Sequence, residues 1–147
     1  MASLPALQLG MNAETYTLVA LATRSSESAA AAAKKYEEMF QREVKGYYGA
    51  GIEQLVNDPN VDLVAISVKA PDHGQAMKYV LEAGKPFLLE WPAGCGSKQT
   101  KEFARMAAEK NIKHMVGLQD RLNPLIGKVC CVSCVSGQNK LLRDDSR

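Results

Sequence analysis

The sequence predicts an α/β fold built on a parallel sheet. Short apolar segments with strand character, such as residues 15–23, 62–68 and 86–90, alternate with segments that have helical periodicity. The connections between these segments are short, and no repeat or low-complexity linker interrupts them. Strands that are apolar throughout are typical of a sheet whose two faces are both covered by helices.

The first elements are a short helix, a strand and a longer helix. Residues 3–9 carry apolar side chains at helical spacing, and Ser3 is a suitable N-cap. Residues 15–23 are rich in Val, Leu, Thr and Tyr, which predicts a strand buried on both faces. Ser26 can cap the alanine-rich helix that we expect over residues 27–40, because alanine has the highest helix propensity.

The middle of the chain repeats the same alternation. A short strand is predicted over residues 44–48, and one or two helical turns over 52–57, which a following Asp-Pro pair ends. Residues 62–68, DLVAISV, predict a second buried strand. A helix over residues 73–83 then ends at Gly84, which suits a left-handed cap.

The last elements are a strand over residues 86–90, a helix over 98–110 capped by Ser97, and a strand over 113–118. In that helix the expected inward residues are Phe103, Ala104 and Ala107. After Pro124 neither a period of 2 nor one of 3.6 is kept, so residues 125–147 read as an irregular tail.

Composition limits the function classes. The chain has 147 residues, 46% of them hydrophobic, and a net charge of +2 from 18 basic and 16 acidic side chains. That balance argues against direct binding of nucleic acid. The sequence contains no apolar stretch of about 20 residues and no signal-peptide pattern at its start, so we expect a cytoplasmic protein without a membrane span. Three clustered cysteines, Cys130, Cys131 and Cys134, lack further ligands, so we expect no metal site.

Four segments together resemble the nucleotide-binding domain of the Gfo/Idh/MocA oxidoreductase family. In order, they are LVALATRSSESAAAAAKKY, NDPNVDLVAISVKAPDH, LEAGKPFLLEWPAG and MVGLQDR, within about residues 15–124. The resemblance implies a Rossmann-like parallel sheet with flanking helices that binds NAD or NADP. It is strongest to the fungal branch that contains the galactose-regulon repressor. Two departures point there: Trp91 follows Glu90 where most members have Lys, and Gln119-Asp120-Arg121 replaces a pattern with Asn before Arg.

Compared with that family, the sequence lacks the first strand and its Gly-x-Gly-x-x-Gly turn. We therefore expect residues 1–124 to be a partial dinucleotide-binding domain, truncated at both ends, with residues 125–147 as a separate tail. The family's strand order would be 3-2-1-4-5-6, with the absent strand in the centre. We expect one of two outcomes. Either residues 15–23 pair directly with residues 62–68 in a closed five-stranded sheet, or unpaired sheet edges make the chain marginally stable and prone to self-association.

Arg24 is the residue that indicates a cofactor preference. It follows the strand over residues 15–23, where an acidic side chain takes the ribose hydroxyls of NAD and an arginine accommodates the 2′-phosphate of NADP. With Ser25 and Ser26 it favours NADP over NAD. The alternative is a solvated surface arginine.

The remaining candidate residues follow later strands. By resemblance, Val68, Lys69, Pro71 and His73 lie along the cofactor, although Lys69 can equally be an exposed turn lysine. The resemblance also places a second set at the cofactor groove: Glu90, Trp91, Gln119 and Arg121. Tryptophan carries no charge, so its place in the family's lysine position weakens the case for hydride transfer; simple packing is the alternative. No catalytic residue is assigned.

These observations favour an NAD(P)-binding Rossmann domain of a Gfo/Idh/MocA-type oxidoreductase. Without the glycine turn, dinucleotide binding should be weak, and we expect no turnover by the chain alone. Two alternatives remain open. One is a non-enzymatic, dinucleotide-sensing transcriptional regulator similar to the galactose repressor, which would also enter the nucleus. The other is an inactive product.

Overall fold

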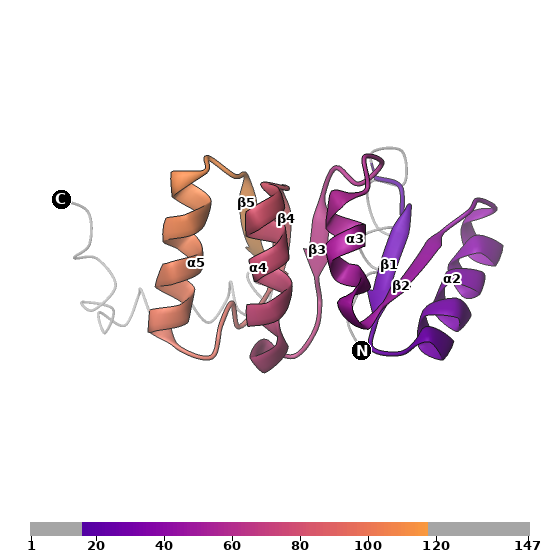
Figure 1. The fold of residues 1–147 in the computed structure, drawn as a ribbon, viewed down its shortest axis with the longest axis horizontal. Helices are drawn as coiled ribbons and strands as arrows, with labels where there is room; N and C mark the ends of the chain where they lie inside the picture. Colours follow the sequence, from indigo (N-terminus) through magenta and orange to yellow (C-terminus); the bar gives the residue numbers. More distant parts are fainter. Residues whose placement is uncertain (1–15, 118–147) are drawn as a thin grey trace, which may run out of the picture. The chain divides into compact units, whose positions relative to one another are not determined.

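The computed structural model describes residues 16–117 (Figure 1). In that range strands and helices alternate, with single 3-10 turns at Gly49–Gly51 and Ala70–Asp72. The elements are β1 (Ala20–Thr23), α2 (Ser26–Phe40), β2 (Lys45–Tyr48), α3 (Ile52–Asn57), β3 (Val64–Ile66), α4 (His73–Ala83), β4 (Phe87–Glu90), α5 (Ser97–Glu109) and β5 (His114–Gly117). The predicted helix over residues 3–9 and the predicted tail lie outside the described residues.

The strands form two separate ladders. Strands β1 and β2 pair in parallel, with Ala20 opposite Lys45. The second sheet has the order β3-β4-β5, and its β3 and β4 are parallel, with Val64 opposite Phe87. Each parallel pair is joined through a helix, as parallel strands require. The α/β fold with parallel strands and flanking helices is therefore confirmed.

The predicted closed five-stranded sheet is wrong. Among residues 16–117, β1 pairs only with β2, and β3 pairs only with β4. The two ladders reproduce the Rossmann order on either side of its first strand, since β2-β1 corresponds to 3-2 and β3-β4-β5 to 4-5-6. Helix α3 contacts β1, β2 and α4, so apolar packing on this helix links the ladders where direct strand pairing was expected.

The hydrophobic core centres on the three-stranded sheet and on α3 and α4. Its least exposed side chains, each at most 2% exposed, are Val56, Met77, Val80, Leu81, Leu89 and Ala107. Val19, Ala20 and Tyr47 from the two-stranded part are only partly buried against this cluster. Strand β1 is therefore half-buried and shorter than the doubly buried strand predicted over residues 15–23, because within the described residues one of its edges has no neighbouring strand.

The helix boundaries agree with those predicted from the sequence, whereas the predicted N-cap residues do not. Helices α3 and α4 have the predicted limits, and Gly84 ends α4 in the left-handed conformation with φ of 68°. However, Ser25, not Ser26, caps α2, because its hydroxyl accepts the N–H of Ser28 in a capping box. Ser97 is the first residue of α5 and does not cap it.

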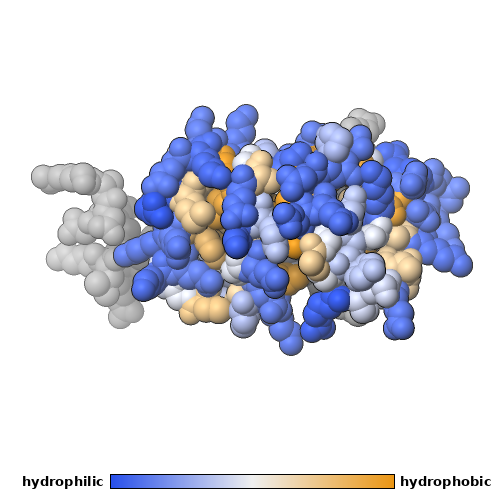
Figure 2. All heavy atoms as spheres, viewed as in Figure 1, coloured by the Kyte–Doolittle hydropathy of each residue, from blue (hydrophilic) through white to orange (hydrophobic). Residues whose placement is uncertain are grey.

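Helix α5 buries less of its surface than expected. Ala107 is fully buried and Phe103 half-buried, but Ala104, predicted to face inward, is exposed. The face of the molecule that carries α4 and α5 is mostly hydrophilic, with smaller apolar areas between the polar side chains (Figure 2). Within residues 16–117, no helix has the length and apolar character that crossing a bilayer requires.

Candidate functional site

The carboxyl ends of β3 and β4 carry polar and apolar side chains side by side. Because the two strands are parallel and in register, Ser67, which follows β3, and Glu90, the last residue of β4, lie at the same edge. The Ser67 hydroxyl donates a hydrogen bond of 2.6 Å to Oε2 of Glu90. Next to them, Val68 is 49% exposed and Trp91 is 65% exposed. This edge therefore presents a fixed carboxylate together with an uncovered indole ring.

His73 starts α4 beneath this edge and is buried, with 1% exposure. Its Nε2 lies 3.0 Å from the carbonyl oxygen of Val68, and its Nδ1 lies 3.4 Å from that of Ala93. A neutral imidazole can donate to one of these acceptors, whereas an imidazolium donates to both. His73 thus connects the segment after β3 with the segment after β4, and its direct contact with a cofactor stays a prediction.

The loop of residues 91–96 is also held from α5. The backbone N–H of Cys95 donates to Oε1 of Gln99 at 2.8 Å. Gly94, in the same loop, is buried against the Gln99 and Thr100 side chains. The peptide bond that precedes Pro92 is cis.

The predicted residues at the end of β1 belong to the other ladder. Arg24 is exposed, and it forms no salt bridge with any residue in the 16–117 range. Ser25 is occupied in the capping box, where its hydroxyl bonds to both the backbone N–H and the hydroxyl of Ser28. Thr23 also bonds to the Ser28 hydroxyl, at 2.6 Å. Arg24 therefore extends from a rigid turn at the amino end of α2.

The other predicted residues are less informative. Lys69 and Pro71 are exposed in the segment between β3 and α4. Ser26 is exposed in the first turn of α2. Gln119 and Arg121 lie outside the described residues. Among the described residues, no group of three or more His, Cys, Asp or Glu side chains is arranged to hold a metal ion.

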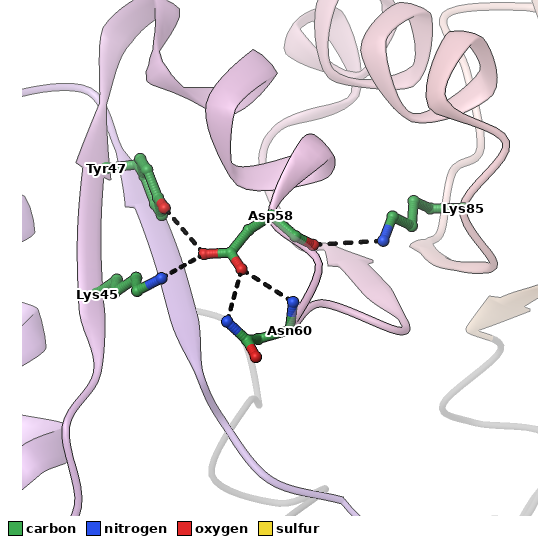
Figure 3. Close-up of polar contacts among 5 residues, drawn as sticks. All are labelled: Lys45, Tyr47, Asp58, Asn60 and Lys85. Atoms are coloured by element: carbon green, nitrogen blue, oxygen red, sulfur yellow. Dashed lines mark hydrogen bonds and ion pairs between the residues drawn. The ribbon is translucent and has the colours of Figure 1, made fainter.

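A second polar cluster surrounds Asp58, in the turn between α3 and β3 (Figure 3). Its Oδ2 accepts hydrogen bonds from Lys45 Nζ at 2.7 Å and from the Tyr47 hydroxyl at 3.2 Å. Its Oδ1 accepts from the backbone N–H and the side-chain amide of Asn60, at 2.9 and 3.0 Å. Lys85 donates to the backbone carbonyl of Asp58 at 3.3 Å.

The protonation of this cluster follows from these contacts. The hydrogen bond from Lys45, assisted by the backbone N–H of Asn60, holds the pKa of the Asp58 carboxyl well below its usual range. The same hydrogen bond to Asp58 raises the pKa of Lys45. Burial, and then the bond to Asp58, raises the pKa of Tyr47. Asp58 is therefore an ionised acceptor at neutral pH.

The Asp58 cluster precedes β3, whereas the Ser67–Glu90 pair follows it, so the two lie at opposite ends of that strand. We interpret the cluster as structural, since every Asp58 oxygen is already engaged by the protein. The sequence reasoning missed it, although the run Asp-Pro-Asn is a typical turn sequence in which an aspartate bonds the backbone two residues on. It also missed Ser67 and Gln99.

The alternation of strands and helices, with a polar edge at the strands' carboxyl ends, defines a dinucleotide-binding type of α/β domain. Residues 3–118 match the family described as "Oxidoreductase family, NAD-binding Rossmann fold". The chain belongs to this Gfo/Idh/MocA oxidoreductase family.

Named relatives agree with that assignment. Dehydrogenase aclE of Aspergillus oryzae is 38% identical over 116 residues, which are 79% of this chain and 30% of that protein. D-xylose 1-dehydrogenase (NADP(+)) of Hypocrea jecorina is 31% identical over 129 residues, 85% of this chain and 31% of that protein. Biliverdin reductase of Synechocystis, solved with biliverdin and NADP+, superposes with a TM-score of 0.64 at 26% identity, covering 78% of this chain and 34% of that one.

The chain thus spans about a third of the length of the relatives it matches.

Proposed function

We propose that this chain forms the dinucleotide-binding part of an NAD(P)-dependent oxidoreductase, with the dinucleotide lying along the carboxyl ends of the strands. The observation that carries the proposal is the edge formed by Ser67, Val68, Glu90 and Trp91 at the carboxyl ends of two parallel, in-register strands. In open α/β sheets, ligands bind outside the carboxyl ends of the strands. The family assignment supplies the class of ligand.

NADP is the dinucleotide we expect to be preferred. The Arg24 guanidinium is exposed and permanently charged, and it stands at the amino end of α2, where an anion is favoured. Among the similar proteins, the D-xylose 1-dehydrogenase carries NADP(+) in its name and the biliverdin reductase was solved with NADP+, whereas levoglucosan dehydrogenase was solved with NADH, so Arg24 carries the preference. The 147-residue sequence contains no Gly-x-Gly-x-x-Gly run, so affinity should be weak.

Titration calorimetry with NADP+ and NAD+ tests the preference. The unchanged chain should bind NADP+ more tightly, and Arg24→Asp should abolish the difference between the two cofactors. Lys101→Asp is the matched control, because it makes the same charge change on the exposed surface of α5 without breaking an ion pair among residues 16–117. Equal affinities in the unchanged chain, or a difference that survives Arg24→Asp, would contradict the proposal.

We further propose that the 147-residue chain has no NAD(P)-linked turnover of sugars or polyols on its own. Trp91 occupies the position where most members of the family have lysine, and an indole can neither carry charge nor transfer a proton. Steady NADPH formation above the blank, lost on Glu90→Gln, would overturn this.

A second candidate function is a regulator in which the dinucleotide alters a protein contact, as in the galactose repressor that the sequence resembles. The exposed, uncharged Trp91 favours it, because aromatic side chains are common in protein interfaces. A regulator would bind NADP+ without any hydride transfer and would enter the nucleus, whereas an enzyme would act in the cytoplasm. An inactive product would bind no dinucleotide in the same titration.

A further inference from the structure

The loop of residues 91–96 is held from two neighbouring helices. From α4, the His73 ring lies 3.4 Å from the carbonyl oxygen of Ala93. From α5, the Gln99 side chain accepts the N–H of Cys95 at 2.8 Å. The two contacts engage the loop two residues apart, one through a carbonyl and the other through an N–H. The loop is therefore contacted from both helices, and the bond to Gln99 defines the orientation of the Cys95 N–H.

Two glycines make room for the Gln99 amide. A Cβ atom on Gly94 would lie 2.9 Å from Oε1 of Gln99, and one on Gly74 would lie 2.9 Å from its Nε2. The amide thus lies between the loop and the first turn of α4, where a side chain in place of either glycine would displace it. This close approach indicates that the Gln99 side chain has a defined position between the two glycines.

His73 extends the connection to the neighbouring strand. Its other ring nitrogen lies 3.0 Å from the carbonyl oxygen of Val68, directly after β3. One buried side chain therefore contacts both segments that leave β3 and β4 at the candidate ligand edge, and a neutral ring donates a hydrogen bond to one of the two carbonyls. Trp91, the first residue of the clamped loop, is 65% exposed at that edge.

We propose that His73 and Gln99 are positioning residues, which clamp the 91–96 loop so that Trp91 offers a fixed ring face to a planar ring of the bound dinucleotide. This inference rests on the proposed function, because it needs the dinucleotide at this edge. Stacking of two rings depends on their offset and distance. A loop ordered before binding avoids the loss of conformational freedom that ordering it on binding would bring.

The free protein tests the clamp without any ligand. Trp91 is the single tryptophan, so fluorescence anisotropy reports on this loop alone. His73→Phe and Gln99→Leu should each lower the anisotropy and speed amide exchange within residues 91–96. Gln99 is only half-buried, so its variant keeps the core intact even where the histidine variant fails to fold.

The matched control is Val80→Ala, a core truncation two turns further along α4. It should lower global stability and leave the anisotropy and the local exchange of the loop unchanged. Unchanged loop signals in Gln99→Leu, or the same loop signals in Val80→Ala, would overturn the clamp.

Binding of NADPH then tests the link to the ligand. Gln99→Leu and Trp91→Ala should each raise the dissociation constant of NADPH about tenfold, which is the effect of losing one hydrogen bond or ring contact. The double variant should be no weaker than Trp91→Ala, because the clamp acts through that ring. Additive losses, or no loss in Gln99→Leu, would overturn the role of Trp91. If the unchanged chain binds no NADPH, the proposed function fails, and the anisotropy and exchange still decide the clamp.

Discussion

The two ladders of the molecule are stabilised by different means. The two-stranded part, from β1 through α2 to β2, has three buried apolar side chains among the described residues: Ala29, Ala33 and Val44. The three-stranded part, from β3 to β5, has most of the buried cluster, including Met77, Val80, Leu81, Phe87 and Leu89. Since hydrophobic stabilisation grows with the apolar area removed from water, the three-stranded part contains most of it.

The two-stranded part is instead attached by α3 and by the Asp58 cluster. Lys45 and Tyr47 in β2 bond to Asp58, and Lys85 bonds to the same turn from the α4–β4 connection, at 2.6 Å to the carbonyl of Val61. A small ladder without a deep core can thus be held by a few polar contacts. The two-stranded part thus combines few buried apolar side chains with polar contacts gathered at a single turn.

The largest expected difference between the two parts concerns truncation of apolar side chains. Met77→Ala, in the fully buried core, should lower the free energy of unfolding by about 2–5 kcal/mol. Val19→Ala, partly buried in the two-stranded part, should lower it by only about 1 kcal/mol. Urea unfolding of both variants measures this, and equal losses would remove the distinction between the parts.

Self-association is the next expected effect. Strands β1 and β3 each have one edge without a strand partner among residues 16–117, and such edges pair with other chains. We expect concentration-dependent association in sedimentation velocity. A peptide with a strand followed by a Gly-x-Gly-x-x-Gly turn should suppress it and raise the melting temperature. A chain that stays monomeric, and whose cooperative melt the peptide does not raise, would contradict this prediction.

Acid sensitivity should follow from Asp58. Its pKa is lower in the folded chain than in the unfolded one, so its contribution is complete above about pH 5 and is lost as the pH falls through the folded-state value. Asp58→Asn should therefore reduce stability at neutral pH and flatten its decline below pH 5. Glu109→Gln, which removes an exposed ion pair on α5, should change stability by about 0.5 kcal/mol or less. If the free energy of unfolding of Asp58→Asn falls just as steeply below pH 5, the acid sensitivity belongs to other carboxyl groups.

The smallest effect is expected from residues 126–147, whose sequence has no amphipathic period. Deleting them should leave the thermal unfolding midpoint unchanged. A large loss of stability would mean that this segment belongs with the core.

Much of the fold was predictable because local signals are strong in this sequence. Helix α4 begins and ends where its periodicity and Gly84 indicate, and α3 ends before Asp58-Pro59 as predicted. The predicted strands are strands in the structure, but the predicted ranges are too long, because apolar residues continue beyond the hydrogen-bonded ones. The pairing of β1 with β3 was wrong, because pairing depends on where α3 packs, which no local pattern encodes.

The candidate site was predictable in position but not in contacts. The segments after β1, β3 and β4 were identified by the rule that ligands bind at carboxyl ends of strands. The bond between Ser67 and Glu90 joins residues 23 apart in sequence, and the contacts of His73 with Ala93 span 20. Such pairs follow from strand register, which only the folded chain defines.

The connectivity of the three-stranded part has a consequence for the order of folding. Its strands and helices follow one another from β3 to β5, and each strand pairs with the next strand along the chain. Contacts at short sequence separation close small loops, which form faster than large ones. The β1–β2 pair spans 25 residues and the β3–β4 pair 23, so it is the larger buried cluster of the three-stranded part that favours its early folding. We therefore expect mutations in α4 to slow refolding, and mutations in β1 or β2 mainly to speed unfolding. The two-stranded part, which contains Arg24, would then be the last part to fold and the first to unfold.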